Sequence, residues 1–347
     1  MPDTNLTDID AIKADIQALS LPSGRRVGQP GHDVARDFLV RRLVDLDLDC
    51  FADDSLILPY SARDEESMVQ TEFANIVGRI PGSQPSLPPV LVGAHYDSVL
   101  DGPCSDDNAA AVAIALAVAE QIKGLPLARD VIIAIFDAEE PPFFHSAAMG
   151  STRFCEDHCG DIAFAAVIIM DSVGHDVEMG DPMLDRLAPA LKKLLFVTGC
   201  ESHSALPPIV ERVTKGAKGL HVVPTLNDYV GDMSDHHSFR LAGHPYLFLS
   251  CGRGRHYHTL EDTPAWINYE KVVRIAAFVL GIVSGIDEHS LPAGNTDSDT
   301  TEFEIKMLKR ALGLAWQPLC GMLGIDEPRS RQDLNLFVQQ LAGAFEV

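Results

Sequence analysis

Four short apolar segments constrain the fold of this 347-residue chain more than any other feature of its sequence. Short continuous apolar segments are typical of strands that are covered on both faces. Segments with helical periodicity lie between them. The alternation predicts an α/β fold, an α-β-α sandwich whose mixed central sheet is mostly parallel and is covered by helices on both faces. The four segments are PVLVGA (89–94), DVIIAIF (130–136), AFAAVIIM (163–170) and HPYLFLS (244–250).

The sequence also predicts how the chain is divided. HSLPAGNTDSDTT at 289–301 interrupts the pattern and is expected to be a linker. We therefore predict a catalytic domain over 1–290 and a helical appendage over 291–347 that packs on it. A further strand is predicted over 71–79. The predicted helices cover 8–19, 32–48, 109–122, 146–158, 184–195, 205–217, 268–286, 302–313 and 331–344.

Charge and cysteine content exclude several classes of protein. The chain has 50 acidic and 27 basic residues, a formal charge of −23, which argues against nucleic acid or an anionic membrane as a partner. No stretch approaches the roughly 20 apolar residues that a membrane span needs, and the first residues do not resemble a secretory signal. Seven irregularly spaced cysteines suggest reduced thiols. We expect a cytoplasmic protein, and no oligomeric state follows from these features.

Histidine or carboxylate side chains follow each of the four apolar segments. In a parallel sheet such strand ends meet at one edge, where binding sites form. Two imidazoles and several carboxylates make a ligand set suited to zinc, and also to manganese or cobalt. With one carboxylate shared, such a set holds two ions about 3.5–4 Å apart. The residues concerned are His95 and Asp97, Asp106 and Asp107, Glu139 and Glu140, Asp171, and His256 and His258.

Two local spacings suggest particular roles. His95 and Asp97 point to the same side of an extended segment, so Asp97 can bind the second ring nitrogen of His95. The adjacent Glu139 and Glu140 point in different directions, so one carboxylate can bind metal while the other acts as a general base. Either pair alone is also common as ordinary surface residues.

The chain resembles co-catalytic zinc aminopeptidases of the bacterial leucyl aminopeptidase type, in the superfamily of glutamate carboxypeptidase and glutaminyl cyclase. The resemblance covers roughly residues 20–287 and rests on six segments in the same order. These are LVGAHYDSV, SDDNAAAVA, FDAEEP, IMDSVG, SDHHSF and YHTLEDT. Any one segment is weakly specific, whereas six in order are highly specific.

The resemblance implies a complete two-zinc site. His95 and Asp171 would bind one ion, and Glu140 and His258 the other. Asp106 would bridge both, next to a strained peptide at Asp106-Asp107. Glu139 would be the general base, with Asp97 supporting His95. Asp235 and His236 match a segment near the site, without a ligand role.

The chain departs from its relatives at two places. The loop after the paired glutamates is longer than usual and carries Phe143 and Phe144. These rings either line a pocket for the first substrate side chain or pack under the loop. Relatives also carry a tyrosine before the Ser-Asp-His segment that polarises the scissile carbonyl. Tyr229 is near that position, and His256 and Tyr257 compete with it for the role.

These features predict a zinc aminopeptidase that acts on a peptide or a small amide through a water activated by two zinc ions. Two alternatives use the same scaffold: a glutaminyl cyclase with one zinc ion, and a carboxypeptidase or amidohydrolase. A third is a binding protein without activity, which the complete ligand set disfavours. Separately, Cys155 and Cys159 lie four residues apart, a spacing that could share a metal. No second cysteine pair completes a four-ligand site, so we expect ordinary helix residues there.

Overall fold

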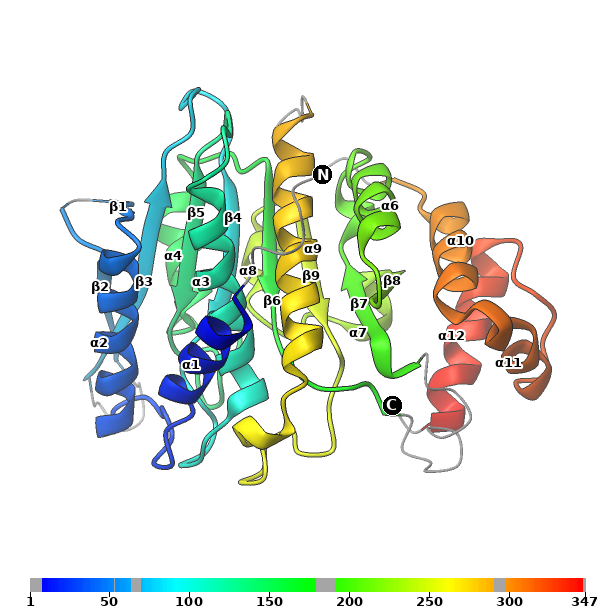
Figure 1. Ribbon diagram of the computed structural model, residues 1–347, viewed down its shortest axis with the longest axis horizontal. Helices are drawn as coiled ribbons and strands as arrows, with labels where there is room; N and C mark the ends of the chain where they lie inside the picture. Colours follow the sequence, from blue (N-terminus) through cyan, green and yellow to red (C-terminus); the bar gives the residue numbers. More distant parts are fainter. Residues whose placement is uncertain (1–7, 53, 64–69, 179–190, 290–297, 346–347) are drawn as a thin grey trace.

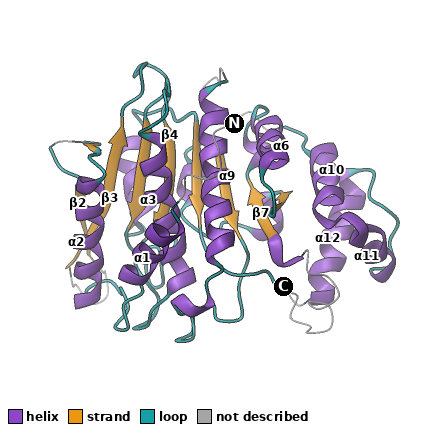
Figure 2. Ribbon diagram, in the orientation of Figure 1, coloured by secondary structure: helices purple, strands orange, loops and turns teal. Residues whose placement is uncertain are grey.

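A single large sheet forms the centre of the molecule (Figures 1 and 2). The computed structural model describes residues 8–52, 54–63, 70–178, 191–289 and 298–345. Within these residues the sheet has nine strands in the order β1-β3-β5-β4-β6-β9-β7-β8, with β2 paired to β3. The strands are β1 Asp49–Cys50, β2 Ile57–Arg63, β3 Gln70–Ile80, β4 Val90–His95, β5 Val131–Phe136, β6 Ala166–Met170, β7 Leu194–Thr198, β8 His221–Thr225 and β9 Tyr246–Ser250.

The four apolar segments form the parallel centre of this sheet. Strands β5, β4, β6 and β9 lie side by side in one direction. Every residue of β4, β5 and β6 is buried, as expected of strands covered on both faces. The sheet is mixed because β3 runs antiparallel to β5 and β7 runs antiparallel to β9. The predicted α/β fold is confirmed.

Helices cover both faces of the sheet. In Figure 1, α1, α2, α3, α6 and α9 lie in front of it, and their apolar residues form the larger core. Behind it, Phe154 of α4 and Phe239 of α8 join a second, aromatic core. No helix of the described residues is long and apolar enough to cross a membrane. The helices of these layers are α1 Ile9–Leu19, α2 Pro30–Asp45, α3 Ala110–Ile122, α4 Gly150–Phe154, α6 Leu206–Gly216, α7 Asn227–Val230, α8 His236–Leu241 and α9 Tyr269–Asp287.

Two predicted elements differ from the structure. Residues 184–190 of the helix predicted over 184–195 lie outside the described residues, and the end of that helix is wrong because Leu194–Thr198 is β7. This apolar segment pairs with β8 and β9, which provides the backbone partners that a strand needs. The helix predicted over 146–158 begins only at Gly150 and ends in a wide turn over Cys155–Cys159. Short 3-10 turns lie at Leu191–Lys193, Cys200–Ser202, Pro264–Trp266 and Gly313–Ala315.

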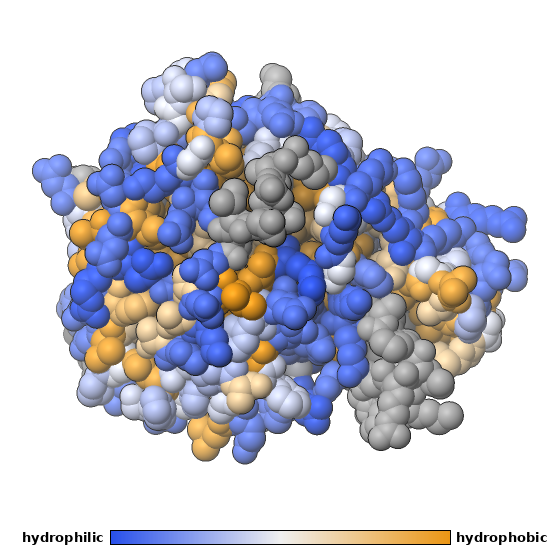
Figure 3. Space-filling model, viewed as in Figure 1, coloured by the Kyte–Doolittle hydropathy of each residue, from blue (hydrophilic) through white to orange (hydrophobic). Residues whose placement is uncertain are grey.

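The last helices pack at the β8 edge of the sheet. They are α10 Thr301–Leu312, α11 Trp316–Met322 and α12 Arg331–Phe345, and α10 lies against β8. Trp316 and Cys320 are buried, but Leu314 is 99% exposed and Met322 53% exposed. Figure 3 shows apolar atoms at the surface of this end of the molecule, on a face that is otherwise mostly hydrophilic. The domain boundary at 290/291 stays a prediction, because residues 290–297 are not described.

A buried ion pair joins α12 to α10. Both oxygens of the Glu304 carboxylate accept from the Arg331 guanidinium, at 2.7 and 3.0 Å. Glu304 is only 2% exposed. Arg331 also donates to the hydroxyl of Tyr229, which in turn donates to Asn335 on α12. These contacts hold α12 against both α10 and α7.

We predict that Arg331→Ala lowers the free energy of unfolding by about 2 kcal/mol. The Glu304 carboxylate would keep its buried position but lose its charged partner, and breaking a buried pair costs more than breaking a surface pair. The expected loss of unfolding free energy is smaller than the usual 3–5 kcal/mol because the Arg331 side chain is itself 28% exposed. Urea unfolding measures the change. Lys306→Ala, which breaks the exposed pair with Glu211, is the control and should change stability by less than about 0.5 kcal/mol. Equal effects of the two substitutions would contradict the prediction.

Candidate metal centre

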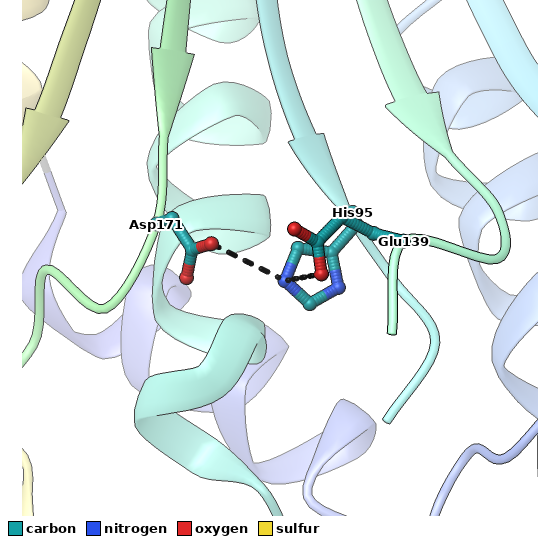
Figure 4. A group of neighbouring side chains, drawn as sticks. All are labelled: His95, Glu139 and Asp171. Carbon is teal, nitrogen blue, oxygen red and sulfur yellow. Dashed lines mark ion pairs between the residues drawn. The ribbon is translucent and has the colours of Figure 1, made fainter. Parts of the chain in front are cut away.

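The polar residues after the central strands converge at one edge of the sheet. His95 is the last residue of β4, Glu139 follows β5 and Asp171 follows β6. Figure 4 shows the carboxylates of Glu139 and Asp171 facing the imidazole of His95. Each has an oxygen 3.7 Å from His95 Nε2. One histidine and two carboxylates thus surround a point just beyond the strand ends.

A second cluster shares His95 and extends to the loop after β9. Glu140 Oε2 lies 3.4 Å from His258 Nε2. The carboxylate of Asp107 stands between the two histidines, with Oδ1 3.4 Å from His95 Nε2 and Oδ2 3.2 Å from His258 Nε2. The two oxygens of Asp107 therefore face different imidazoles, which is the arrangement that a bridging carboxylate requires.

The expected bridging role of Asp106 is wrong in this structure. Its carboxylate points away from both clusters and accepts from the Gly174 backbone N–H at 2.5 Å and from His175 Nδ1 at 2.6 Å. Adjacent residues of the turn Ser105–Ala109 face opposite ways, and the sequence offers two aspartates without showing which faces inward. The unusual peptide also lies one bond later than expected: Asp107-Asn108 is cis.

Asp262 fixes the turn that carries Asp107. Its two carboxylate oxygens accept from the backbone N–H groups of Asp106 and Asp107, at 2.9 and 3.1 Å. Asp262 is 2% exposed and lies four residues after His258. The loop that carries one histidine therefore also positions the carboxylate between the histidines. The sequence pattern assigned no role to Asp262, although the residue lies within the YHTLEDT segment.

Asp97 joins His95 to the paired glutamates. Its Oδ1 lies 3.3 Å from His95 Nδ1, on the side of the ring opposite the clusters. The same carboxylate accepts from the backbone N–H groups of Glu139 and Glu140, both at 3.0 Å. Burial acts to raise the pKa of Asp97, but His95 and these N–H groups lower it. Asp97 is thus charged, and it fixes the ring and the loop together.

Asp137, the first residue after β5, holds the start of the same loop. It accepts from the Tyr96 hydroxyl at 3.0 Å and from the Ala74 N–H at 2.8 Å, and it pairs with His32 Nε2 at 2.7 Å. Asp137 is fully buried. The loop after β5 is therefore held by the side chain of Asp137 and by the backbone N–H groups of the two glutamates. The side chains of the glutamates take no part in these contacts and face the clusters.

The clusters have the properties of a cation site. Nε2 of His95, Nε2 of His258 and Oε1 of Glu140 are buried without a hydrogen-bond partner in the described part of the chain. Four carboxylates surround the two imidazoles, and unpaired buried charge is costly. Burial raises the pKa of Glu139 well above its usual range and that of Glu140 to about 7. Imidazole nitrogens and carboxylate oxygens directed at the same space fit zinc or a similar divalent ion. The four carboxylates are those of Asp107, Glu139, Glu140 and Asp171.

Asp235 is a further buried acid in this region. It precedes α8 and has no exposed surface. Burial raises its pKa to about 7, while the charge of His95 acts in the opposite direction. Its own charge in turn raises the pKa of Glu139. The structure thus adds a carboxyl group beside the first cluster to which the sequence assigned no role.

The rings predicted to contact substrate have different surroundings in the structure. Phe143 packs edge-to-face on Phe73 under the loop, whereas Phe144 stacks on the exposed ring of His145. Tyr257 stacks on His258. Burial and the charges of Asp107 and other cluster carboxylates raise the pKa of its hydroxyl. His256 contacts the edge of Trp266 instead.

Tyr229, one of the three candidates for contact with the scissile carbonyl, lies at the contact with the C-terminal helices. Its hydroxyl binds Arg331 and Asn335 of α12, and the charges that act on it are those of Arg331, Glu304 and Asp228. None of these belongs to the clusters. A residue in the right stretch of sequence therefore serves the contact with the C-terminal helices.

The model of Peptidase family M28 matches residues 75–283, which contain every residue of the two clusters. A vacuolar membrane protease of Schizosaccharomyces pombe is 31% identical over 106 residues, 30% of this chain and 13% of that protein. The uncharacterized protein YfbL of Escherichia coli is 26% identical over 218 residues, 56% of this chain and 66% of that protein. The chain thus spans less than two thirds of the length of these curated relatives.

Solved structures show the same fold at low sequence identity. A glutaminyl cyclase of Fimbriiglobus ruber superposes with a TM-score of 0.65 at 19% identity, covering 82% of this chain and 97% of that chain. A Zn-dependent exopeptidase of Parabacteroides distasonis has a TM-score of 0.63 at 17% identity, covering 81% and 99%. A leucine aminopeptidase precursor of Bacteroides thetaiotaomicron has a TM-score of 0.62 at 16% identity, covering 81% and 98%.

The placement of the two aspartates predicts different effects of substitution. Asp107→Asn should reduce the amount of zinc bound per chain, because it removes the charge of a carboxylate whose two oxygens face different histidines. Asp106→Asn should retain the bound zinc, since its carboxylate binds Gly174 and His175 instead. Metal analysis after gel filtration measures both. Loss of zinc in Asp106→Asn with retention in Asp107→Asn would reverse the assignment.

Zinc affinity should rise steeply with pH. Burial acts to lower the pKa of His258, but Asp107 and Glu140 raise it to about 10, and the pKa of Glu140 is raised to about 7. Between pH 6 and 8 the metal-free protein therefore holds protons that zinc must displace. The apparent affinity should increase more than tenfold per pH unit, because more than one proton is released. Competition with a chromophoric chelator at each pH measures it, and a constant affinity would contradict protonation of His258 and Glu140 in the metal-free protein.

Proposed function

Because the chain belongs to Peptidase family M28, we propose that it is a zinc-dependent aminopeptidase that removes residues from the N-terminus of peptides. The observation that carries the proposal is the position of Asp107 between two complete sets of ligands. His95 and Asp171 stand on one side of it, and Glu140 and His258 on the other. Two ions are proposed because each side offers its own imidazole and its own carboxylate. Manganese or cobalt fits the same oxygen and nitrogen ligands.

Zinc in these positions would polarise the scissile carbonyl and lower the pKa of a water molecule towards about 7. The protein's own part is to move the proton. We assign that task to Glu139, which lies three residues after the end of β5 and faces the imidazole of His95. Its carboxylate takes a proton from the attacking water and then delivers it to the nitrogen of the leaving peptide. Asp97 keeps Glu139 in place by accepting from its backbone N–H.

Two aromatic rings are candidates for contact with the substrate. Tyr257, stacked on His258 and facing the carboxylates, is the candidate for contact with the scissile carbonyl. Phe144, with His145, is the candidate wall for the first substrate side chain. Phe143 is assigned to packing because it lies against Phe73. The cytoplasmic location stays a prediction.

Glutaminyl cyclisation is the second candidate, because the glutaminyl cyclase of Fimbriiglobus ruber shares this fold. That reaction needs only one zinc ion. In this chain its ligands would be Asp107, Glu140 and His258. The presence of Asp171 and of His95, whose Nε2 has no hydrogen-bond partner in the described residues, on the other side of Asp107 supports the hydrolase. A carboxypeptidase or amidohydrolase would use the same ligands on a different end of the substrate.

We predict that Glu139→Ala retains two zinc ions but loses turnover by about 10²–10⁴-fold, the usual contribution of a general base. Metal analysis and the rate of peptide cleavage are measured on the same sample. Glu120→Ala, at an exposed acid of α3, is the control and should leave both unchanged. Loss of one zinc ion in Glu139→Ala would show that Glu139 is a ligand, since it also lies within reach of His95 and Asp171.

The proposed function is tested by digesting a mixed peptide pool with zinc-loaded protein and analysing the products by mass spectrometry. The pool contains matched free and N-acetylated peptides, some beginning with glutamine, with and without a chelator. Stepwise loss of N-terminal residues from free peptides only, abolished by the chelator, is the expected result. Loss of residues from the other end, or loss of ammonia from glutamine peptides alone, would replace the aminopeptidase by one of the alternatives.

A further inference from the structure

Two thiols lie in contact on the back of the sheet. Cys155 and Cys159 are the first and last residues of the wide helical turn that ends α4. In the neutral pair the Cys159 thiol donates to Cys155 Sγ at 2.8 Å. Both residues are partly exposed, whereas Cys104, Cys200, Cys251 and Cys320 are buried. The two thiols are therefore close to each other and also within reach of a small reagent.

The surroundings of the pair favour a thiolate on Cys159. The imidazole of His244 lies beside Cys159, and its Nε2 atom is buried without a hydrogen-bond partner in the described ranges. The ring is held in place edge-on to Phe164. When Cys159 loses its proton, the thiol of Cys155 can donate to the thiolate. This hydrogen bond, with His244, lowers the pKa of Cys159 to about 6.

Cys155 is suited to the second step. The hydrogen bond to Cys159 and burial raise its pKa, so it keeps its proton while Cys159 reacts. The charges near it are negative, from Asp235 and Glu156, which disfavours a second thiolate. The two cysteines thus differ in reactivity although they are adjacent in space. One has the character of an attacking thiol and the other that of a resolving thiol.

The side-chain geometry favours a disulfide between the pair. The two Sγ atoms are already 2.8 Å apart, so both side chains point towards each other. Closure shortens this contact to the S–S bond length of about 2.05 Å.

We propose that Cys155 and Cys159 are a modification site for hydroperoxides, at which Cys159 is oxidised first and Cys155 closes the disulfide. The Cys159 thiolate attacks one peroxide oxygen, the O–O bond breaks, and the leaving oxygen takes up a proton to depart as water or an alcohol. The resulting sulfenic acid is attacked by Cys155, which forms the S–S bond and releases water. Two thiols are oxidised and one peroxide is reduced by two electrons.

Cys50 provides a control within the same molecule, because it is also partly exposed but has no thiol partner in the described residues. Trypsin releases Cys155 and Cys159 on peptide 154–186, which contains no other cysteine. The zinc-loaded protein is treated with limiting hydrogen peroxide, blocked with N-ethylmaleimide and digested without reductant. Peptide 154–186 should lose two hydrogen atoms and remain unblocked, at a rate at least tenfold above the oxidation of Cys50, and dithiothreitol should reverse the change. Blocking of both thiols after Cys50 has been oxidised would overturn the proposal.

Substitutions test the order of the two steps. Cys155→Ser should accumulate a sulfenic acid on Cys159 that dimedone traps, because the resolving thiol is missing. His244→Asn should slow alkylation of Cys159 by iodoacetamide roughly 3- to 10-fold at pH 7, because the thiolate loses its neighbour. Absence of a dimedone adduct in Cys155→Ser, or an unchanged alkylation rate in His244→Asn, would contradict Cys159 as the attacking thiol. The wild-type experiment does not depend on whether these variants fold.

Discussion

The crowding of four buried carboxylates around two imidazoles is the constraint on which the rest of this structure depends. Asp107, Glu139, Glu140 and Asp171 all lie within 4 Å of His95 or His258. Carboxylates this close and this buried repel each other and lose their hydration, so the arrangement needs protons or cations. Parallel strands make the crowding possible, because β4, β5 and β6 end at one edge and each is followed by an acid or a histidine. The sheet concentrates the charge, and protons or cations must neutralise it.

The repelling carboxylates stay close together only if the loops that carry them cannot move apart. Buried polar groups hold these loops in place. Asp97 and Asp262 accept from backbone N–H groups of the residues that carry the inward-facing carboxylates. Arg25, fully buried, donates to the carbonyl oxygens of Leu19, Tyr96, Pro103 and Cys104, and thereby joins α1 to the loops after β4. The clustered side chains are therefore held by groups that face away from the metal centre.

The sequence predicts the sheet well because burial on both faces leaves continuous apolar segments, as in β4 and β5. It fails at Leu194–Thr198, where the choice of strand over helix depends on partners supplied by β8 and β9. The residues at the strand ends were also identifiable, since parallel topology brings them together. The choice between Asp106 and Asp107 could not be made from the sequence. It depends on the direction of two carboxylates in one turn and on Asp262, which lies 155 residues after Asp107. The contact of Tyr229 with α12 was not predictable either, because no pattern in the sequence indicates it.

The central claim is that Asp107 stands between two metal ions, each with its own imidazole. Anomalous diffraction from crystals of the zinc-loaded protein, recorded on both sides of the zinc absorption edge, tests it without reference to any substrate. Two peaks are expected, about 3.5–4 Å apart, one beside His95 and Asp171 and the other beside Glu140 and His258, with the Asp107 carboxylate between them. A single peak, or two peaks bridged by Asp106, would contradict the claim.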